Sequence, residues 1–90
     1  MTYSIKIQLS AERQLKKLPT KTRSLIGELI DSLSDNPRPG GCKKLKGKRN
    51  FYRVKSCDYR VIYTIEDDVL LVTVVRMKIR GEAYLKLDRL

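Results

Sequence analysis

Hydrophobic residues alternate with polar ones at the start of the chain. The apolar positions of this run are Tyr3, Ile5, Ile7 and Leu9. Side chains two residues apart share one face of a strand, so this period predicts a strand with one buried face. We therefore expect the chain to open with a half-buried strand.

The apolar spacing then changes to that of helices. Ser10 is a candidate N-cap for a short helix that runs to Leu18, where Pro19 interrupts it. Thr20 is a candidate N-cap for a second helix. We expect this helix to end at Asn36-Pro37, because a residue before proline disfavours helical geometry. One stripe at helical spacing marks the buried face of this helix: Leu25, Ile26, Leu29, Ile30 and Leu33. The pattern predicts a helical hairpin on a flat partner.

Three strand-like runs supply that partner, at residues 50–56, 58–66 and 69–76. Tight turns are marked by Ser56-Cys57-Asp58 and by Asp67-Asp68. The third run contains VLLVTVV, which is almost entirely apolar. Such a run is typical of a central strand covered on both faces for most of its length.

The order of elements defines the expected fold. The tail, residues 80–90, has helical composition, so the full order is β-α-α-β-β-β-α. This order predicts an α+β fold in which two N-terminal helices pack on an antiparallel β-sheet. Ninety residues leave no room for a second core, so we expect a single domain spanning residues 1–90.

Basic residues dominate the composition. Twenty Lys and Arg against ten Asp and Glu give a net charge of +10 and a pI near 9.9. A small domain this basic attracts polyanions, with nucleic acid as the first candidate. Acidic proteins and anionic membranes are competing partners, and cationic solubility without any partner is the simplest alternative.

The positive charge is unevenly placed. No carboxylate lies between Asp35 and Asp58, and surfaces usually mix the two signs. The cations in this window are Arg38, Lys43, Lys44, Lys46, Lys48, Arg49, Arg53 and Lys55. The window therefore indicates contact with a polyanion.

Several other functional classes are not supported. The chain has no histidine, and no stretch approaches the ~20 apolar residues of a membrane span. The N-terminus lacks the apolar region of a signal peptide, so we expect a cytoplasmic protein. Cys42 and Cys57 fit neither a metal site nor a disulfide framework and are interpreted as reduced thiols. We expect no metal and no cofactor.

Cations inside the predicted strands form the candidate site. Arg53 and Lys55 share a strand face, and Arg60 joins them across the turn if the register allows. Arg76 ends the third strand. Tyr52, Tyr59 and Tyr63 fall on the opposite alternation and are assigned to the core, whereas Arg80 and Tyr84 are spaced as one helical turn.

These residue types suit RNA chemistry. Guanidinium groups grip phosphate oxygens in pairs, and cationic neighbours lower the pKa of a lysine. An aromatic ring adds a surface on which a base can stack. RNA can be cleaved without metal or histidine, because its own 2′-hydroxyl attacks the adjacent phosphate. Composition alone, however, indicates only nucleic-acid binding.

Two sequence stretches resemble a known family. KKLKGKRNFYRVKSCDYRVIY resembles the RelE/ParE toxin superfamily in its K-L-x-G, Y-R-V-K and x-Y-R-V-I-Y segments. VVRMKIRGEAY is similar to the family's closing V-V-x-V-x-x-R-x-E-V-Y. With the helix start S…A…L.KLP, the resemblance covers essentially the whole chain.

The resemblance implies a toxin of a type II toxin–antitoxin system with the microbial-RNase-like RelE fold. RelE-type members cleave mRNA in the ribosomal A site without metal and inhibit translation. The implied partners are an acidic cognate antitoxin, the ribosome and mRNA. Operator DNA is implied only for the toxin–antitoxin complex, and no membrane is involved.

The family's active-site positions appear here with their residues. By this resemblance Lys55 matches the catalytic lysine and Arg60 the transition-state arginine. Arg80 matches a later catalytic arginine and Tyr84 the C-terminal tyrosine. The remaining cations are assigned to substrate binding: Arg53, Lys43, Lys44, Lys46, Lys48, Arg49 and Arg76.

Two departures leave the proton transfers open. Asp58 replaces a common glycine, and Ile79 stands where some relatives carry an acid or base. Two other functions also stay open. One is a ParE-like DNA gyrase poison without enzymatic activity, and the other is a basic nucleic-acid-binding domain. For each cation the simpler reading is a solvated surface charge, and Tyr84 could anchor the terminal helix.

Overall fold

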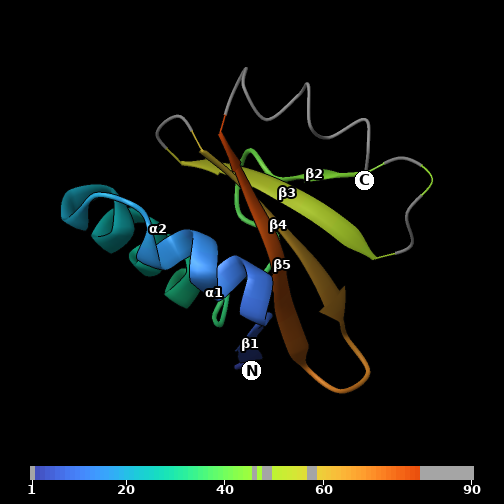
Figure 1. The fold of residues 1–90 in the computed structure, drawn as a ribbon. Coiled ribbons are helices and arrows are strands. Elements are labelled where there is room, and N and C mark those ends of the chain that lie inside the picture. Colours follow the sequence, from blue (N-terminus) through green and yellow to red (C-terminus); the bar gives the residue numbers. More distant parts are fainter. Residues whose placement is uncertain (1, 46, 48–49, 57–58, 80–90) are drawn as a thin grey trace.

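The computed structural model describes residues 2–45, 47, 50–56 and 59–79 (Figure 1). Their elements, in chain order, are β1 (Ser4–Ile7), α1 (Leu9–Lys16), α2 (Thr20–Ser32), β2 (Lys43–Lys44), β3 (Phe51–Ser56), β4 (Tyr59–Glu66) and β5 (Leu71–Ile79). No helix within these residues is long and apolar enough to cross a membrane.

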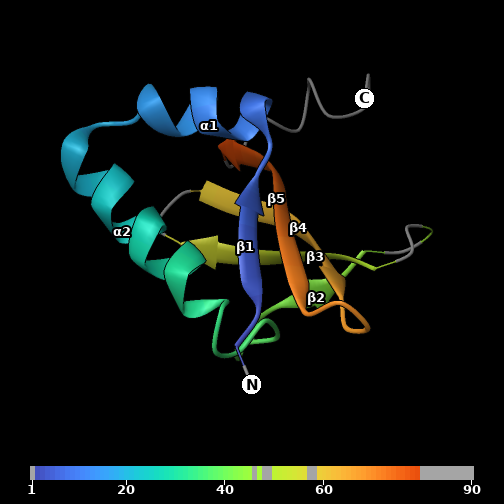
Figure 2. The ribbon, with the colours of Figure 1, turned by 90° about the horizontal axis from the view of Figure 1, so that it is seen from below.

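The strands form one sheet in the order β1-β5-β4-β3-β2, with both helices on one of its faces (Figures 1 and 2). The predicted α+β fold is confirmed, and β3, β4 and β5 form the antiparallel meander. The sheet as a whole is mixed, because β1 pairs in parallel with β5. The predicted terminal helix, residues 80–90, lies outside the described residues.

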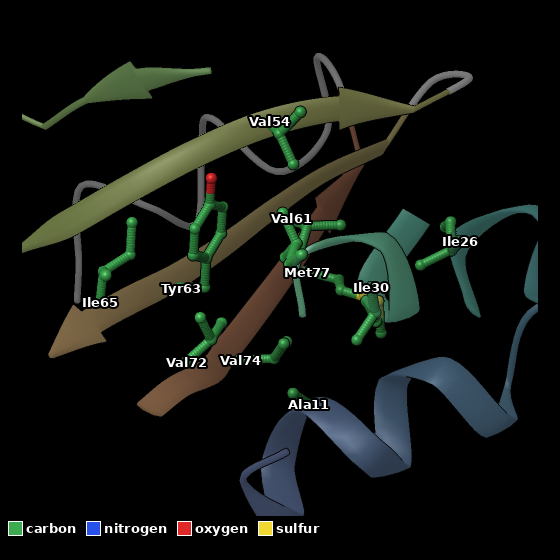
Figure 3. Close-up of a cluster of buried hydrophobic side chains, with 11 residues drawn as sticks. Ala11, Ile26, Ile30, Val54, Val61, Tyr63, Ile65, Val72, Val74 and Met77 are labelled. Atoms are coloured by element: carbon green, nitrogen blue, oxygen red, sulfur yellow. The ribbon is translucent and has the colours of Figure 1, made fainter. Parts of the chain in front are cut away.

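The core fills the space between the helices and one face of the sheet (Figure 3). Burying each large aliphatic side chain stabilises the fold by roughly 1.5–3 kcal/mol. The helices contribute Ala11, Ile26, Ile30 and Leu33, and the strands contribute Val54, Val61, Tyr63, Ile65, Val72, Val74 and Met77. The strand residues alternate along β3 and β4, so every second side chain faces away from the helices.

Apart from the end of α2, which lies at Ser32 and not at residues 36–37 as expected, three details of the predicted helices are wrong. Ser10 lies inside α1, where Gln8 holds the N-cap position, and Gln8 N–H donates to Val74 O at 2.9 Å. The sheet, not a capping side chain, therefore sets the start of α1. Thr20 is the first residue of α2, because the Pro19 carbonyl accepts the first helical hydrogen bond, from Arg23 N–H.

The third correction concerns Leu25. Ile26 and Ile30 are buried as expected, but Leu25 is 41% exposed. Successive helical residues are ~100° apart, and Leu25 falls at the edge of the stripe, beyond the reach of the sheet. The buried face of α2 is therefore narrower than the sequence pattern predicts.

A polar cluster around Arg38 ties the segment after α2 to the sheet. Arg38 donates two hydrogen bonds to Asp67, at 3.2 and 2.8 Å, and Tyr3 donates a third at 2.6 Å. The Arg38 guanidinium also lies 5.2 Å from the centre of the Tyr52 ring. Hydrogen bonds from Arg38 and Tyr3 hold the pKa of the Asp67 carboxyl below its usual value. Arg38, predicted as part of the polyanion-binding window, is thus paired with a distant carboxylate.

The tyrosines of the meander belong to the core, as predicted. Tyr63 is fully buried, its hydroxyl donates to Pro37 O at 2.7 Å, and burial raises the pKa of its phenol. Its ring stacks on Tyr52 at a centroid distance of 6.1 Å. Tyr52 and Tyr59 are half-buried against the same core.

Candidate nucleic-acid interface

Five cations occupy the face of the meander that turns away from the helices. Val54, Val61 and Met77 point into the core (Figure 3), so their neighbours along each strand point outward. We call the outward set the cationic face: Arg53, Lys55, Arg60, Arg76 and Lys78. The prediction that Arg53 and Lys55 share a face follows from this alternation.

Strand register brings three of these cations into one line. Lys55 pairs directly with Arg60, and Arg60 pairs directly with Lys78. Side chains of directly opposed residues start about 4.5–5.5 Å apart. We call this line the Lys55 row. The register condition on which Arg60 was expected to join Lys55 is met.

A second line runs parallel to the first. Lys43 pairs with Arg53, Arg53 with Ile62, and Ile62 with Arg76. Ile62 is only 9% exposed and stands outside the helix-side core. The cationic face therefore has an apolar residue between two arginines. Lys44 pairs with Tyr52 and falls on the opposite alternation, so it is not part of this face.

A β-bulge in β5 turns two of the five residues of the cationic face outward. The β4–β5 register shifts between Ile62 and Tyr63, leaving Val75 without an opposite residue. Val74 is buried, so an unbroken period of two would turn Arg76 and Lys78 inward. The extra residue reverses this parity, burying Met77 and turning both cations outward.

The end of β5 differs from the prediction in two respects. Arg76 was expected to end the third strand, but β5 continues to Ile79. Lys78 was not predicted as a site residue at all. The signal available in the sequence was the alternation of Arg76, Met77 and Lys78, which repeats the basic–apolar–basic pattern of Arg53 to Lys55.

The surroundings of Lys78 favour its neutral form. Partial burial, followed by the charges of Arg76 and Arg60, lowers the pKa of its ammonium. Arg60 is half-buried, with its Nε atom inaccessible to solvent, whereas Lys55 is exposed. The Lys55 row thus combines an exposed lysine, a half-buried arginine and a lysine that releases its proton more readily.

The remaining predicted site residues cannot be placed. They lie outside the described residues: Lys46, Lys48, Arg49, Arg80 and Tyr84. Within the described ranges, no three His, Cys, Asp or Glu side chains gather into a group that could hold a metal ion.

Comparisons with known proteins agree with the fold and the sequence resemblance. A family model described as "ParE toxin of type II toxin-antitoxin system, parDE" matches residues 5–84. A protein of Methanocaldococcus jannaschii named "Putative toxin RelE1" is 31% identical over 93% of this chain and 97% of its own. "Toxin RelE" of Mycobacterium tuberculosis is 28% identical over 91% of this chain and 86% of its own.

Solved structures show the same arrangement. The archaeal RelE–RelB complex from Pyrococcus horikoshii aligns with a TM-score of 0.81 and 32% identity, covering 92% of this chain and all of that one. The RelBE2 toxin–antitoxin complex of Mycobacterium tuberculosis aligns with a TM-score of 0.77 and 25% identity, covering 89% of this chain and 100% of that one. The chain therefore belongs to the ParE toxin family of type II toxin–antitoxin systems, within the RelE/ParE superfamily.

Proposed function

We propose that this toxin is a RelE-type endoribonuclease that cleaves mRNA in the ribosomal A site without a metal ion and so inhibits translation. One observation carries the proposal. The Lys55 row places a lysine, an arginine and a second lysine side by side. They lie on the sheet face opposite to the one that packs against the helices. A gyrase poison or a plain RNA binder does not need this combination.

Arg60 stands at the centre of the proposed reaction. The 2′-oxygen of the substrate attacks the adjacent phosphorus, and the pentacoordinate intermediate carries extra negative charge. A guanidinium can donate two parallel hydrogen bonds to its oxygens. Loss of one such donor costs roughly 2–4 kcal/mol of transition-state stabilisation in comparable sites. Half-burial strengthens the effect, because water competes less with the phosphate.

The two lysines take different roles in the proton transfers. The pKa of Lys78 is lowered, so Lys78 is the proposed acceptor for the 2′-hydroxyl proton. Lys55 is exposed and donates a proton to the departing 5′-oxygen. The 2′-oxygen bonds to phosphorus, the bond to the 5′-oxygen breaks, and the products are a 2′,3′-cyclic phosphate and a 5′-hydroxyl. Arg80 and Tyr84, outside the described residues, are proposed to assist as the resemblance implies.

The second line of the cationic face is proposed to hold the flanking phosphates. Arg53 and Arg76 lie on either side of Ile62, and Lys43 extends the line by one strand. Lys44, on the other alternation, is proposed to contact the ribosome instead. The same role is proposed for the basic residues of the undescribed segments: Lys46, Lys48 and Arg49.

The proposed partner is an acidic antitoxin that covers the cationic face. Two of the most similar solved structures are described as complexes of RelE-type toxins with RelB-type partners. A net charge of +10 accelerates association with an acidic partner and makes the rate fall as salt rises. Operator DNA is proposed to bind only the toxin–antitoxin complex, and action on ribosomes places the toxin in the cytoplasm.

The chemistry of the cut ends tests the proposal. Programmed ribosomes are treated with the toxin in excess EDTA, with ribosome integrity checked by sedimentation, and the 3′ ends of the mRNA are mapped. We expect cleavage to persist and to leave a 2′,3′-cyclic phosphate or 3′-phosphate, because the nucleophile is the 2′-hydroxyl. Fragments ending in a 3′-hydroxyl would rule out this mechanism.

A second candidate function is poisoning of DNA gyrase. It is favoured by the matching family model, which is described as a ParE toxin. A gyrase supercoiling assay with the wild-type protein separates the two. Inhibition of gyrase that survives removal of Lys55 and Arg60, without any mRNA cleavage, would favour this second function.

A further inference from the structure

The last part of β5 is not covered by a strand on the side where β1 lies. The β1–β5 pairing ends at Ile7 and Val74, and Gln8 N–H closes it by donating to Val74 O at 2.9 Å. β5 then continues to Ile79, and no described strand lies on that edge beyond Val74. Buried backbone N–H and C=O groups that lack a hydrogen-bond partner cost free energy, so the groups at this edge need other partners.

Helix α1 takes over from β1 at this edge. Ser10 and Gln14 are four residues apart and so share one helix face. The Gln14 amide donates from Nε2 to Met77 O at 2.8 Å and accepts at Oε1 from Met77 N–H at 3.0 Å. Ser10 Oγ lies 3.5 Å from Val75 O, at the limit of a hydrogen bond. One side chain therefore satisfies both backbone groups of Met77, as a neighbouring strand would.

This contact lies just after the bulge. Val75 is the extra residue, and a one-residue slip of the strand beyond it would exchange the two faces of β5. Met77 would then leave the core, and Lys78 would turn toward the helices. Within the described residues, the hydrogen bonds of the Gln14 side chain both go to the backbone of Met77, and they form only while the Met77 N–H and C=O point toward α1.

We propose that Gln14 is a positioning residue that locks the register of β5 beyond the bulge and thereby holds Lys78 opposite Arg60. The catalytic consequence rests on the proposed ribonuclease function, but the positioning itself does not. Among the described residues, the charges that act on Lys78 are those of Arg76 from β5 and Arg60 from β4. Gln14 reaches β5 from the helix side and hydrogen-bonds the backbone of Met77, so it acts through that backbone.

Two substitutions at Gln14 separate positioning from simple packing. Gln14→Leu keeps the size of the side chain and removes both hydrogen bonds. Gln14→Glu reproduces both bonds only when its carboxyl is protonated, because an ionised carboxylate cannot donate to Met77 O. The matched control is Gln8→Leu, which removes an exposed amide from the residue preceding α1 and leaves its backbone bond in place.

The readouts are the exchange rate of the Met77 amide, the NMR titration of Lys78, and single-turnover cleavage. For Gln14→Leu we expect Met77 exchange at least ~10-fold faster, because local opening becomes easier. We expect the Lys78 titration to move toward that of a free lysine. The maximal cleavage rate should fall at least ~10-fold, with the half-saturating ribosome concentration changed less than ~3-fold. Gln14→Glu should approach wild-type exchange and rate as pH falls toward 5, with the wild type measured at each pH.

The outcomes are distinguishable. Unchanged Met77 exchange and Lys78 titration in Gln14→Leu would overturn the positioning role, whatever the activity. Faster exchange with an unchanged Lys78 titration would overturn the link between Gln14 and Lys78, and a shifted titration with an unchanged cleavage rate would overturn the catalytic consequence. If the wild type cleaves no mRNA, the proposed function fails, and the two NMR readouts still decide the positioning claim. If Gln14→Leu does not fold, Gln14→Glu decides it through the pH dependence of Met77 exchange.

Discussion

The two lysines that flank Arg60 differ in what folding does to them. Lys55 is exposed, whereas Lys78 is half-buried beside Arg76 and Arg60. These surroundings lower the pKa of Lys78, so its charged form is less stable in the folded protein than in the unfolded chain. The charge therefore opposes folding at neutral pH, and the opposition disappears only as pH rises past the lowered folded pKa. Such a cost is typical of a residue retained for function.

Removing the Lys78 charge should weaken activity and strengthen the fold. For Lys78→Met we expect cleavage at least ~10²-fold slower, the lower end of the usual loss when a proton-transfer group is removed. We expect Tm to rise, with a gain at pH 7 of roughly 0.2–1 kcal/mol, the size of a single surface charge interaction. Single-turnover cleavage and thermal melts measure the two effects. Lys6→Met, which removes an exposed cation from β1, is the control. A variant that cleaves like the wild type, or that loses stability, would contradict the assignment.

Two devices at the scale of elements set the shape of the site. The bulge at Val75 turns the end of β5 outward, and the Arg38 cluster anchors the segment that leads into β2. Asp67 joins this cluster from the β4–β5 turn and receives bonds from both Arg38 and Tyr3. A single carboxylate therefore connects the residue before β1, the segment after α2 and the turn before β5.

The Asp67 contribution should depend on pH in a defined direction. Its folded pKa is depressed, so the stability it adds is fully present above the unfolded value of ~3.9 and is lost as pH falls through the folded pKa. We expect Asp67→Asn to lower Tm by the same amount at pH 7 and pH 5. The difference from the wild type should shrink as pH falls through the folded pKa of Asp67. Asp68→Asn, in the same turn, is the control, and an equal loss of Tm in both variants would contradict the role of the cluster.

The strands were predictable because alternation alone determines which residues share a face. That rule was enough to place Arg53 and Lys55 on one face and Tyr63 in the core, whereas the position of Arg60 beside Lys55 depended on the register. Alternation did not locate the bulge, because the run from Leu71 to Val75 is apolar at almost every position and does not show where the parity changes. The pairing of Arg38 with Asp67 spans 29 positions, and no local pattern encodes it. The two N-cap predictions were wrong because they considered side chains alone. The start of α1 is set by a backbone hydrogen bond to the sheet, and the first helical hydrogen bond of α2 is accepted by the Pro19 carbonyl.

On the scale of the whole molecule, the two faces of the sheet have separate tasks. One face packs against α1 and α2 and holds the core, so it supplies the rigidity (Figure 1). The other carries the cationic face, which we propose binds the polyanion. The composition was sufficient to predict a polyanion partner, since the net charge of +10 is independent of the fold. Composition could not indicate which of the 20 basic residues form the cationic face, because the membership of this face depends on the register of the sheet.

The most direct test of this division compares two arginines on opposite layers. Arg60 lies in the Lys55 row, and Arg23 is exposed on α2. Arg60→Met and Arg23→Met remove the same charge, and both are assayed by single-turnover cleavage of A-site mRNA after their folding is checked. We expect Arg60→Met to lose about 10²–10³-fold in rate, the loss typical of one transition-state donor. Arg23→Met should stay within about twofold of the wild type, because an exposed charge on the helix layer makes no such contact. Equal losses in the two variants, or no loss for Arg60→Met, would contradict the assignment of the cationic face as the catalytic surface.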